Sequence, residues 1–395
     1  MTGKPRRPAV HTGPAGAPTE RRETALSVVF DAYWWDSGPP SLRHVLREII
    51  LAWREEFPHD DLTLVMRTKA ARPERDLLPG PVRVARTALW PQAFAATWAV
   101  RRVARRAGAD LVLTHNFAAR APGAVSAVYL HDVLFRTNPE WFTLTERAYF
   151  SLMTRWVSRA DVVFTSSRSE AARITKFSRA RRVCPVGLGL STELVARNML
   201  EDADPRLQGS RYFLTVGRLN VRKNLQHTVL AALQSGELSP QTPLVIVGEA
   251  DGKLGLVDRQ CRDAVTSGAV IFTGFVSEAR LRWLYRNASL FLFLSLGEGF
   301  GMPPLEAAYF GAPLLVSDLP VFRETLGTRA RYVDPTHITT IARAIAASTV
   351  PRQRGDAFDP GELAQEHNWQ TIVRAMRTIA SESRTSPTKR RKSTS

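Results

Sequence analysis

The chain has 395 residues, of which 44% are hydrophobic, and a formal net charge of +17. At this length we expect two domains rather than one compact core. No apolar stretch is long enough to span a bilayer, which argues against an integral membrane protein. Cys184 and Cys261 are too few for a disulfide framework, so the composition favours a soluble protein of the reducing cytoplasm over a secreted one.

The positive charge is unevenly distributed. Residues 1–24 and 381–395 carry net charges of +3 and +4 and lack the apolar core of a secretory signal, so we expect disordered basic tails. Residues 25–190 carry a further +9. This excess is explained either by attraction to an anionic membrane or acidic substrate, or by compositional bias, since Arg outnumbers Lys by 47 to 7. Nucleic acid is a less favoured partner, because no known nucleic-acid module is visible.

The first half of the chain alternates short apolar runs with amphipathic stretches, a pattern typical of parallel α/β architecture. The predicted strands are 26–33, 61–67, 82–87, 110–116, 125–132 and 161–167. Helices are predicted over 42–57 and 92–108. The second has an Arg-rich face and should end at Gly108.

The second half repeats this rhythm after a polar segment, 199–210, which we expect to be a linker. Its predicted strands are 212–218, 243–249, 269–275, 290–296, 312–318 and 331–335. The repetition predicts two doubly wound domains, 25–198 and 211–360, facing each other. A C-terminal helix over 361–380 is expected to pack back toward the N-terminal domain.

Ligands of open α/β sheets bind outside the carboxyl ends of the strands, so the residues after each strand are the candidates. Arg218 and Lys223 follow the first strand of the second half, and Gly217 permits a close approach of the backbone. Two cations beside a helix N-terminus suit a diphosphate. A solvated loop with ordinary surface charges is the alternative.

The turn after the predicted strand 269–275 contains Gly274 and Phe275, and Ser277 has the character of a helix N-cap. This turn would suit a nucleobase held against exposed backbone groups. A plain strand–turn–helix junction accounts for it equally well.

The stretch GEGFGMPPLE, which follows the strand 290–296, is the most specific. Pro303 and Pro304 suit the first turn of a helix, which leaves Glu298 in a glycine-rich turn and Glu306 behind it. Each carboxylate can accept hydrogen bonds from two vicinal hydroxyls, such as those of a sugar or a ribose.

Carboxylates that bind hydroxyls, with cations nearby that bind phosphates, are what a nucleotide-sugar site requires. The competing interpretation is the general acid/base pair of a hydrolase. A hydrolase has no need of the cations at positions 218 and 223.

These residues together resemble the group 1 (family 4 type) retaining glycosyltransferases of the GT-B fold. The resemblance rests on Glu298 and Glu306, which are separated by seven intervening residues that begin with a Gly-Phe-Gly turn, and on the G-R-x4-K signature that begins at Gly217. It covers roughly residues 25 to 380 and is strongest over 212–335. It implies two Rossmann-like domains facing across a cleft.

The resemblance also implies roles for the matched residues. Arg218 and Lys223 would neutralise the donor diphosphate, Glu298 would contact the transferred sugar, and Glu306 would bind the ribose. His131 would reach the donor sugar from the acceptor side. The expected catalytic residues are Arg218, Lys223, Glu298 and His131. The expected donor-binding residues are Gly217, Phe275, Val276, Gly299, Phe300, Gly301, Leu305 and Glu306. The acceptor-side candidates are Gly38 and Asp132. Around Gly38 the stretch WWDSGPPS is stiffer than the glycine-rich turn usual in this family, so the acceptor loop is expected to differ.

The implied activity is transfer of a hexose from a nucleoside-diphosphate sugar, GDP- or UDP-linked, to an acceptor hydroxyl with retention of anomeric configuration. The expected acceptor is a sugar, a glycan or a lipid-linked intermediate of cell-surface polysaccharide or glycolipid synthesis. We expect no metal and a cytoplasmic location, with an anionic membrane surface as a candidate partner at the inner face. A catalytically silent nucleotide-sugar-binding protein of the same fold, and a basic nucleic-acid-binding protein, are the alternatives.

Overall fold

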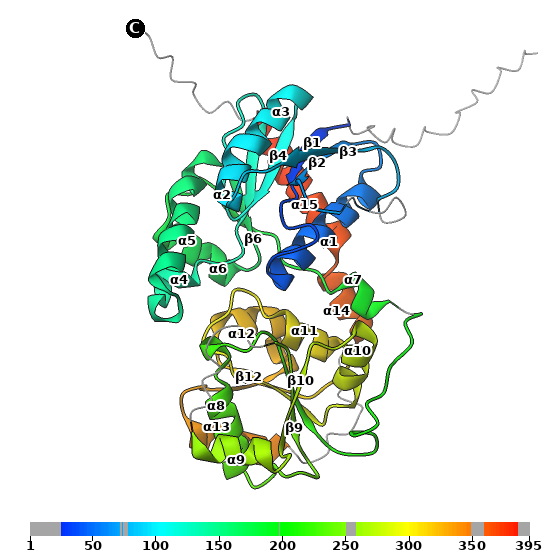
Figure 1. Ribbon diagram of the computed structural model, residues 1–395, viewed down its shortest axis with the longest axis vertical. Helices are drawn as coiled ribbons and strands as arrows, with labels where there is room; N and C mark the ends of the chain where they lie inside the picture. Colours follow the sequence, from blue (N-terminus) through cyan, green and yellow to red (C-terminus); the bar gives the residue numbers. More distant parts are fainter. Residues whose placement is uncertain are drawn as a thin grey trace, which may run out of the picture.

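The computed structural model describes residues 25–71, 73, 78–196, 198–249, 258–348 and 359–385. It has two α/β halves stacked along the long axis, with the N-terminal half above the C-terminal half in Figure 1. The expected tail 1–24 and the last ten residues lie outside the described residues. The C-terminal tail was predicted to begin at residue 381, which is wrong, because a helix continues to Thr385.

The N-terminal half is built on a parallel sheet of seven strands in the order β3-β2-β1-β4-β5-β6-β7. The strands are β1 (Ser27–Asp31), β2 (Asp61–Arg67), β3 (Val82–Thr87), β4 (Leu111–His115), β5 (Val125–Tyr129), β6 (Val162–Thr165) and β7 (Val183–Pro185). Every residue of β4, β5 and β6 is buried, as expected for strands covered on both faces.

The helices of this half are α1 (Pro40–Glu56), α2 (Gln92–Phe94), the π-helical η1 (Ala95–Val100), α3 (Arg101–Ala107), α4 (Leu134–Thr137), η2 (Pro139–Trp141), α5 (Leu144–Trp156), η3 (Val157–Arg159), α6 (Arg168–Phe177) and α7 (Thr192–Val195). The helix predicted over 92–108 is present as α2, η1 and α3 in succession, and Gly108 ends it in the left-handed conformation. The capping box of Thr143 and Glu146 starts α5.

The C-terminal half repeats the plan with a parallel six-stranded sheet in the order β10-β9-β8-β11-β12-β13. Its strands are β8 (Phe213–Val216), β9 (Leu244–Val247), β10 (Val270–Gly274), β11 (Leu290–Phe293), β12 (Leu314–Ser317) and β13 (Arg331–Val333). Its helices are η4 (Val221–Lys223), α8 (Leu225–Gln234), α9 (Arg259–Thr266), α10 (Glu278–Asn287), α11 (Met302–Tyr309), α12 (Pro320–Leu326), η5 (Gly327–Arg329) and α13 (Ile338–Ser348).

Both sheets are doubly wound, and the strand order reverses beside the first strand of each. The reversal falls between β1 and β4 in one half and between β8 and β11 in the other. Crevices at such points, outside the carboxyl ends of the strands, are where open α/β sheets bind ligands.

The chain ends by crossing back to the N-terminal half, where the red helix lies against α1 in Figure 1. Where one helix was predicted over 361–380, the structure has α14 (Pro360–Glu366) and α15 (Trp369–Thr385). The indole N–H of Trp369 donates to Leu190 O at 2.8 Å, and Arg377 pairs with buried Asp60 at 3.1 Å.

The segment 199–210 runs between α7 and β8 and is anchored to the C-terminal half. Arg280 of α10 forms ion pairs with Asp202 at 2.8 Å and with Asp204 at 3.2 Å. Asp204 is itself buried. None of the helices in the described ranges has both the length and the apolarity needed to cross a membrane.

Candidate functional site

Two opposite charges meet where the strand order of the C-terminal sheet reverses. Lys223 follows β8 and Glu298 follows β11, and the Lys223 ammonium donates to Glu298 Oε1 at 2.7 Å. The same ammonium lies 4.2 Å from the ring centroid of Phe293, at the end of β11. Leu296 N donates to Arg222 O at 2.8 Å, which ties the two loops together. The sequence therefore placed these two residues correctly at one sheet edge, and the structure brings them into direct contact.

The protonation of this pair is set by burial and by a second cation. Burial raises the pKa of Glu298, but the nearby charges of Arg222 and Lys223 outweigh it and hold the pKa at about 2. Burial lowers the pKa of Lys223, and Glu298 partly offsets this effect. Glu298 is therefore ionised at neutral pH, with Oε1 on the ammonium and Oε2 3.8 Å from Arg222 Nη2. Sequence reasoning missed Arg222, although it lies inside the G-R-x4-K signature.

Two glycines end neighbouring strands beside this pair. Gly217 after β8 has φ +145°, and an added Cβ would lie 3.1 Å from the Lys223 side chain. Gly248 after β9 has φ +138°, and a Cβ there would lie 2.0 Å from Gly217 O. Arg218, the other predicted cation, directly follows Gly217. A side chain at position 217 would crowd Lys223, and a side chain at position 248 would clash with the backbone of Gly217.

The glycine-rich turn that holds Glu298 leads into α11, as predicted. Helix α11 begins at Met302 with prolines in its first turn, and Gly301 precedes it at φ +98°. Phe300 is 6% exposed and Leu305 is 1% exposed, so their side chains are part of the core. Any donor contact from these two positions would have to come from the backbone.

Glu306, the second glutamate of the motif, differs from Glu298 in its protonation. Glu306 is buried on α11 and accepts a hydrogen bond of 2.9 Å from the hydroxyl of buried Tyr285. Burial raises the pKa of Glu306 to about 7, because the Tyr285 hydroxyl offsets the loss of water only in part. Glu306 therefore titrates near neutral pH, whereas Glu298 remains ionised.

The turn after β10 is open to solvent. The side chain of Phe275 is 78% exposed, and Val276 is partly buried against the core. Ser277 caps α10 by accepting from Arg280 N at 3.2 Å, as predicted. The turn thus offers an exposed aromatic ring at the place where the sequence predicted a nucleobase.

On the N-terminal side, the predicted His131 stands beside a second histidine that sequence reasoning missed. His115 Nδ1 and His131 Nε2 are 3.5 Å apart, and the two rings are stacked. Burial lowers the pKa of His115 to about 3, and burial together with His115 lowers that of His131 well below its usual value. Both imidazoles are neutral at pH 7, so either can donate or accept a hydrogen bond without a charge.

His131 and Asp132 face the glycine turn of the other half. A Cβ added to Gly299 would lie 3.1 Å from His131 O and 3.2 Å from Asp132 Cβ. Gly299 O accepts hydrogen bonds from Ser166 at 3.1 Å and Ser167 at 2.9 Å. The turn after Glu298 is thus in contact with the N-terminal half, and a side chain at position 299 would be tightly crowded there.

A second polar cluster lies at the reversal point of the N-terminal sheet. Gln92 donates to Asp31 Oδ2 at 3.0 Å and to His115 O at 3.1 Å, and accepts from the Trp34 indole at 2.8 Å. Burial raises the pKa of Asp31 to about 6 despite these hydrogen bonds. Sequence reasoning missed Asp31, because the predicted strand 26–33 ran past it, whereas β1 ends at Asp31.

Gly38, predicted on the acceptor side, serves a local turn. Its φ is +88°, and an added Cβ would lie 2.3 Å from the ring of Trp34. The glycine therefore lets the chain pass across the indole before α1 begins at Pro40. The atoms nearest to Gly38 therefore belong to the Trp34 ring and not to the Lys223–Glu298 pair.

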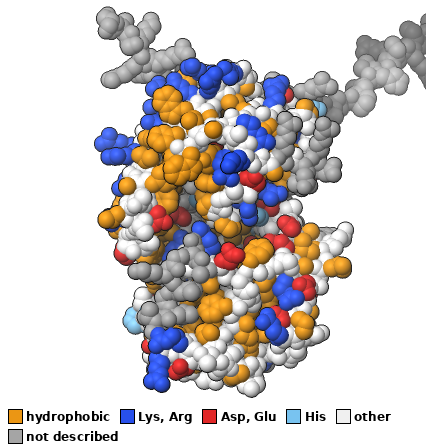
Figure 2. All heavy atoms as spheres, in the orientation of Figure 1, with side chains coloured by type: hydrophobic (Ala, Val, Ile, Leu, Met, Phe, Trp, Pro, Cys, Tyr) orange, Lys and Arg blue, Asp and Glu red, His pale blue; other side chains and the backbone are white. Residues whose placement is uncertain are grey.

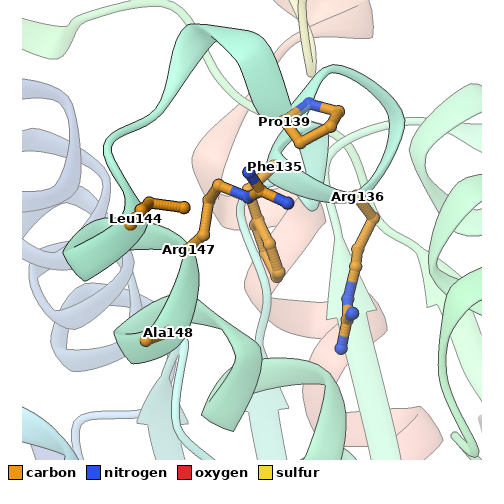
Figure 3. Close-up of a pocket in the computed structure, with 6 residues that line it drawn as sticks. All are labelled: Phe135, Arg136, Pro139, Leu144, Arg147 and Ala148. Carbon is orange, nitrogen blue, oxygen red and sulfur yellow. The ribbon is translucent and has the colours of Figure 1, made fainter.

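A pocket of about 390 Å³ lies on the N-terminal half between α4 and α5. Figure 3 shows Phe135, Arg136 and Pro139 on one side and Leu144, Arg147 and Ala148 on the other, with the Arg147 side chain directed toward Phe135. The Arg136 guanidinium is bonded to Thr154 at 2.7 Å, which leaves Arg147 as the cation facing the hollow. Across the described ranges, no three His, Cys, Asp or Glu side chains form a group that could hold a metal ion.

The comparison with known families decides the identity of the C-terminal half. The sequence model described as "Glycosyl transferases group 1" matches residues 200–349, the segment that contains Lys223, Glu298 and Glu306. This segment is a group 1 glycosyltransferase domain.

Curated proteins similar to this chain include two O-antigen chain mannosyltransferases. One is RfbU of Salmonella typhimurium, 36% identical over 53% of this chain and 56% of its own length. Another is mannosyltransferase B of Escherichia coli, 29% identical over 55% of this chain and 59% of its own length. The serotype-specific mannosyltransferase WbdA of E. coli matches over 26% of its length. The chain therefore spans well under two thirds of these relatives.

Solved structures show the same architecture over almost the whole chain. Sucrose-phosphate synthase from Thermosynechococcus elongatus superposes with a TM-score of 0.67 at 18% identity, over 90% of this chain and 98% of that one. Anabaena HepE, in complex with UDP and glucose, gives a TM-score of 0.63 at 18% identity, over 90% of this chain and 100% of that one. The predicted GT-B fold is confirmed.

Proposed function

We propose that this chain transfers a hexose from a nucleoside-diphosphate sugar to an acceptor hydroxyl with retention of anomeric configuration. One observation carries the proposal. The buried Lys223–Glu298 pair, with Arg222 beside it, stands at the point of strand reversal in a group 1 domain. A diphosphate needs the cations and a sugar needs the carboxylate, and this pair offers both within one crevice.

Each member of the pair has a separate task in the proposed reaction. Lys223 and Arg218 stabilise the negative charge that develops on the departing diphosphate, in the way a divalent cation would. Ionised Glu298 keeps Oε1 on Lys223 and uses Oε2 to accept from hydroxyls of the transferred sugar. Glu306, in its ionised form, accepts from the ribose hydroxyls.

The N-terminal half supplies the acceptor side. Asp132 and the neutral imidazole of His131 belong to the segment that lies against the glycine turn after Glu298, so the two halves meet at the proposed position of the reacting sugar. Domain closure over this position excludes water and limits hydrolysis of the donor. The resemblance suggests a front-face route in which the leaving phosphate takes the proton of the acceptor hydroxyl.

Mannose is the sugar we propose first, because the relatives RfbU, mannosyltransferase B and WbdA are named mannosyltransferases. The two O-antigen enzymes favour a glycan or lipid-linked acceptor of cell-surface polysaccharide synthesis, at the cytoplasmic face of the membrane. Both GDP- and UDP-linked donors fit the same pair of glutamates.

The Lys223→Ala variant tests the assignment. Loss of a cation that stabilises a developing charge costs a few kcal/mol, so we expect turnover to fall on the order of a hundredfold. The assay measures release of nucleoside diphosphate in the presence of acceptor. The matched control is Lys176→Ala, at an exposed lysine of α6, which should keep full activity. Full activity of Lys223→Ala would remove the basis of the proposal.

Two further assays separate the finer points. Proton NMR of the first-formed product should show the anomeric configuration of the donor, and an inverted product would exclude a retaining enzyme. Turnover in excess chelator should equal turnover without it, because cations of the chain take the place of a metal. Complete loss of activity in chelator would contradict this part of the proposal.

A further inference from the structure

The helix formed by α2, η1 and α3, together with the segment just before it, exposes an unusual row of large apolar side chains. Leu89 is 43% exposed, Trp90 78%, Phe94 46% and Trp98 68%. These four fall within ten consecutive positions, whereas the other large exposed apolar residues of the described chain are scattered singly. Single exposed apolar side chains are ordinary, but a contiguous patch marks an interaction surface.

The same row continues as a line of arginines. The backbone stays helical through the junctions of α2, η1 and α3, so Phe94, Trp98, Arg102 and Arg106 follow one another at intervals of four on one side of the helix. Arg101 and Arg105 lie beside them, and all four arginines are exposed. Figure 2 shows hydrophobic side chains gathered over the α2 and α3 region, with Lys and Arg side chains above them.

The opposite side of this helix is buried in the core of the N-terminal half. Ala93, Ala96, Val100 and Ala104 are buried and pack against the N-terminal sheet. The aromatic row therefore cannot turn inward, and it has no place in the core of this chain. We call Trp90, Phe94, Trp98, Arg102 and Arg106 the aromatic–arginine stripe.

We propose that the aromatic–arginine stripe docks this protein on an anionic lipid surface. Aromatic rings in such a stripe enter the boundary between headgroups and acyl chains, and the arginines stay at the level of the anionic headgroups. The net charge of +9 in residues 25–190, of which the stripe and its flanking arginines form a part, complements that surface. A nucleic acid would be attracted by the arginines but would leave the continuous apolar half of the stripe without a role.

The orientation of the helix places the aromatic half next to the acceptor side of the crevice. Gln92, at the start of α2, is bonded to Asp31 at the carboxyl edge of the sheet. The arginine half runs away from that edge toward Gly108, at the start of the segment that leads into β4. A bilayer lying along the stripe would therefore approach the carboxyl edge of the N-terminal sheet. This inference concerns binding and not turnover, so it stands or falls separately from the proposed transfer.

The test is co-sedimentation of the full chain with phosphatidylcholine vesicles, with and without phosphatidylglycerol. We expect binding to the anionic vesicles only, and weaker binding at high salt. Arg102→Glu with Arg106→Glu should weaken that binding on the order of 30-fold. Trp90→Ala with Trp98→Ala should weaken it roughly tenfold or more. The charge control is Arg259→Glu with Arg343→Glu, two exposed arginines of the C-terminal half.

Each outcome decides for or against the stripe. Because the altered side chains are exposed, all variants should keep the melting temperature of the wild type, which calorimetry checks. Equal binding by every variant, loss of binding only when residues 1–24 and 386–395 are removed, or the same affinity for neutral vesicles would overturn the proposal. A dimer in solution that dissociates in the tryptophan variant, or salt-sensitive RNA binding without vesicle binding, would overturn it as well.

Discussion

Two carboxylates of the same motif differ in charge because their nearest neighbours differ. Glu298 and Glu306 are buried to the same degree, at 8% and 9% exposed. Glu298 faces Lys223 and Arg222, and its pKa is held at about 2. Glu306 has no such cations beside it in the described chain: burial raises its pKa to about 7, the Tyr285 hydroxyl offsets this in part, and the charge of Glu278 adds to it. Residue type and spacing predicted the two positions, but their charge depends on neighbours from other segments of the chain.

The raised pKa of Glu306 has a consequence for stability. Its pKa in the folded protein, about 7, lies above the ordinary value of 4.5, so the folded state binds more protons between these values. Stability contributed by protonated Glu306 is thus lost as the pH rises from about 4.5 to about 7. Glu306→Gln keeps the shape and cannot titrate.

We therefore expect the free energy of unfolding of the wild type, relative to that of Glu306→Gln, to fall across this window. Urea denaturation at a series of pH values measures it. A constant difference across the window would contradict the raised pKa. Asp318→Asn serves as the control, since this exposed carboxylate pairs with Arg323 on the surface.

At the scale of elements, the N-terminus of α6 forms a second bridge between the halves. The backbone N–H groups of Arg168 and Ser169 donate to Glu324 of α12 at 2.6 and 3.1 Å. A carboxylate at a helix N-terminus is stabilised by the helix dipole and by the free N–H groups. Together with the contacts of Gly299, this bridge joins the two halves, and we expect it to favour their closure over the proposed donor site.

Glu324→Ala should loosen that closure. We expect hydrolysis of the donor to rise about fivefold relative to transfer, because a bridge of roughly 1 kcal/mol no longer excludes water. Chromatography of free sugar against glycosylated acceptor measures the ratio. Glu140→Ala, at an exposed glutamate bonded to its neighbour Asn138, should leave the ratio unchanged. An unchanged ratio in Glu324→Ala would show that the bridge does not govern closure.

The elements around the site were predictable where one segment determines them. Strands β8 to β13 and the start of α11 follow from apolar runs, glycines and prolines that are local in sequence. Strand β7 (Val183–Pro185) was missed, because it has only three residues and ends in a proline at the edge of the sheet. The pairing of Asp31 with Gln92, 61 positions apart, required the fold.

At the scale of the whole molecule, α15 makes the C-terminus of the chain part of the N-terminal half. Arg377 and Asp60 form a buried pair 317 positions apart, and Asp60 also accepts from Leu26 N and from the Trp53 indole. Loss of one partner of a buried pair leaves the other charge uncompensated. The repeated strand rhythm predicted two domains, but no local pattern showed which residues would hold the returning helix.

Arg377→Ala should therefore destabilise the chain by about 3 kcal/mol. The control is Arg374→Ala, one turn earlier on the same helix, whose pair with Glu56 is solvent-exposed and should contribute less than about 1 kcal/mol. Urea unfolding followed by tryptophan fluorescence measures both. Equal losses in the two variants would contradict a structural role for the buried pair.

The central claim is that the crevice beside Lys223 and Glu298 binds a nucleoside-diphosphate sugar. A thermal-shift screen of the wild type and Lys223→Ala against GDP- and UDP-linked hexoses tests it most directly, because a ligand of the folded state raises the melting temperature with the logarithm of its excess. We predict that at least one donor raises the melting temperature of the wild type and that this shift is lost in Lys223→Ala. No shift with any donor, or the same shift in both proteins, would contradict the claim.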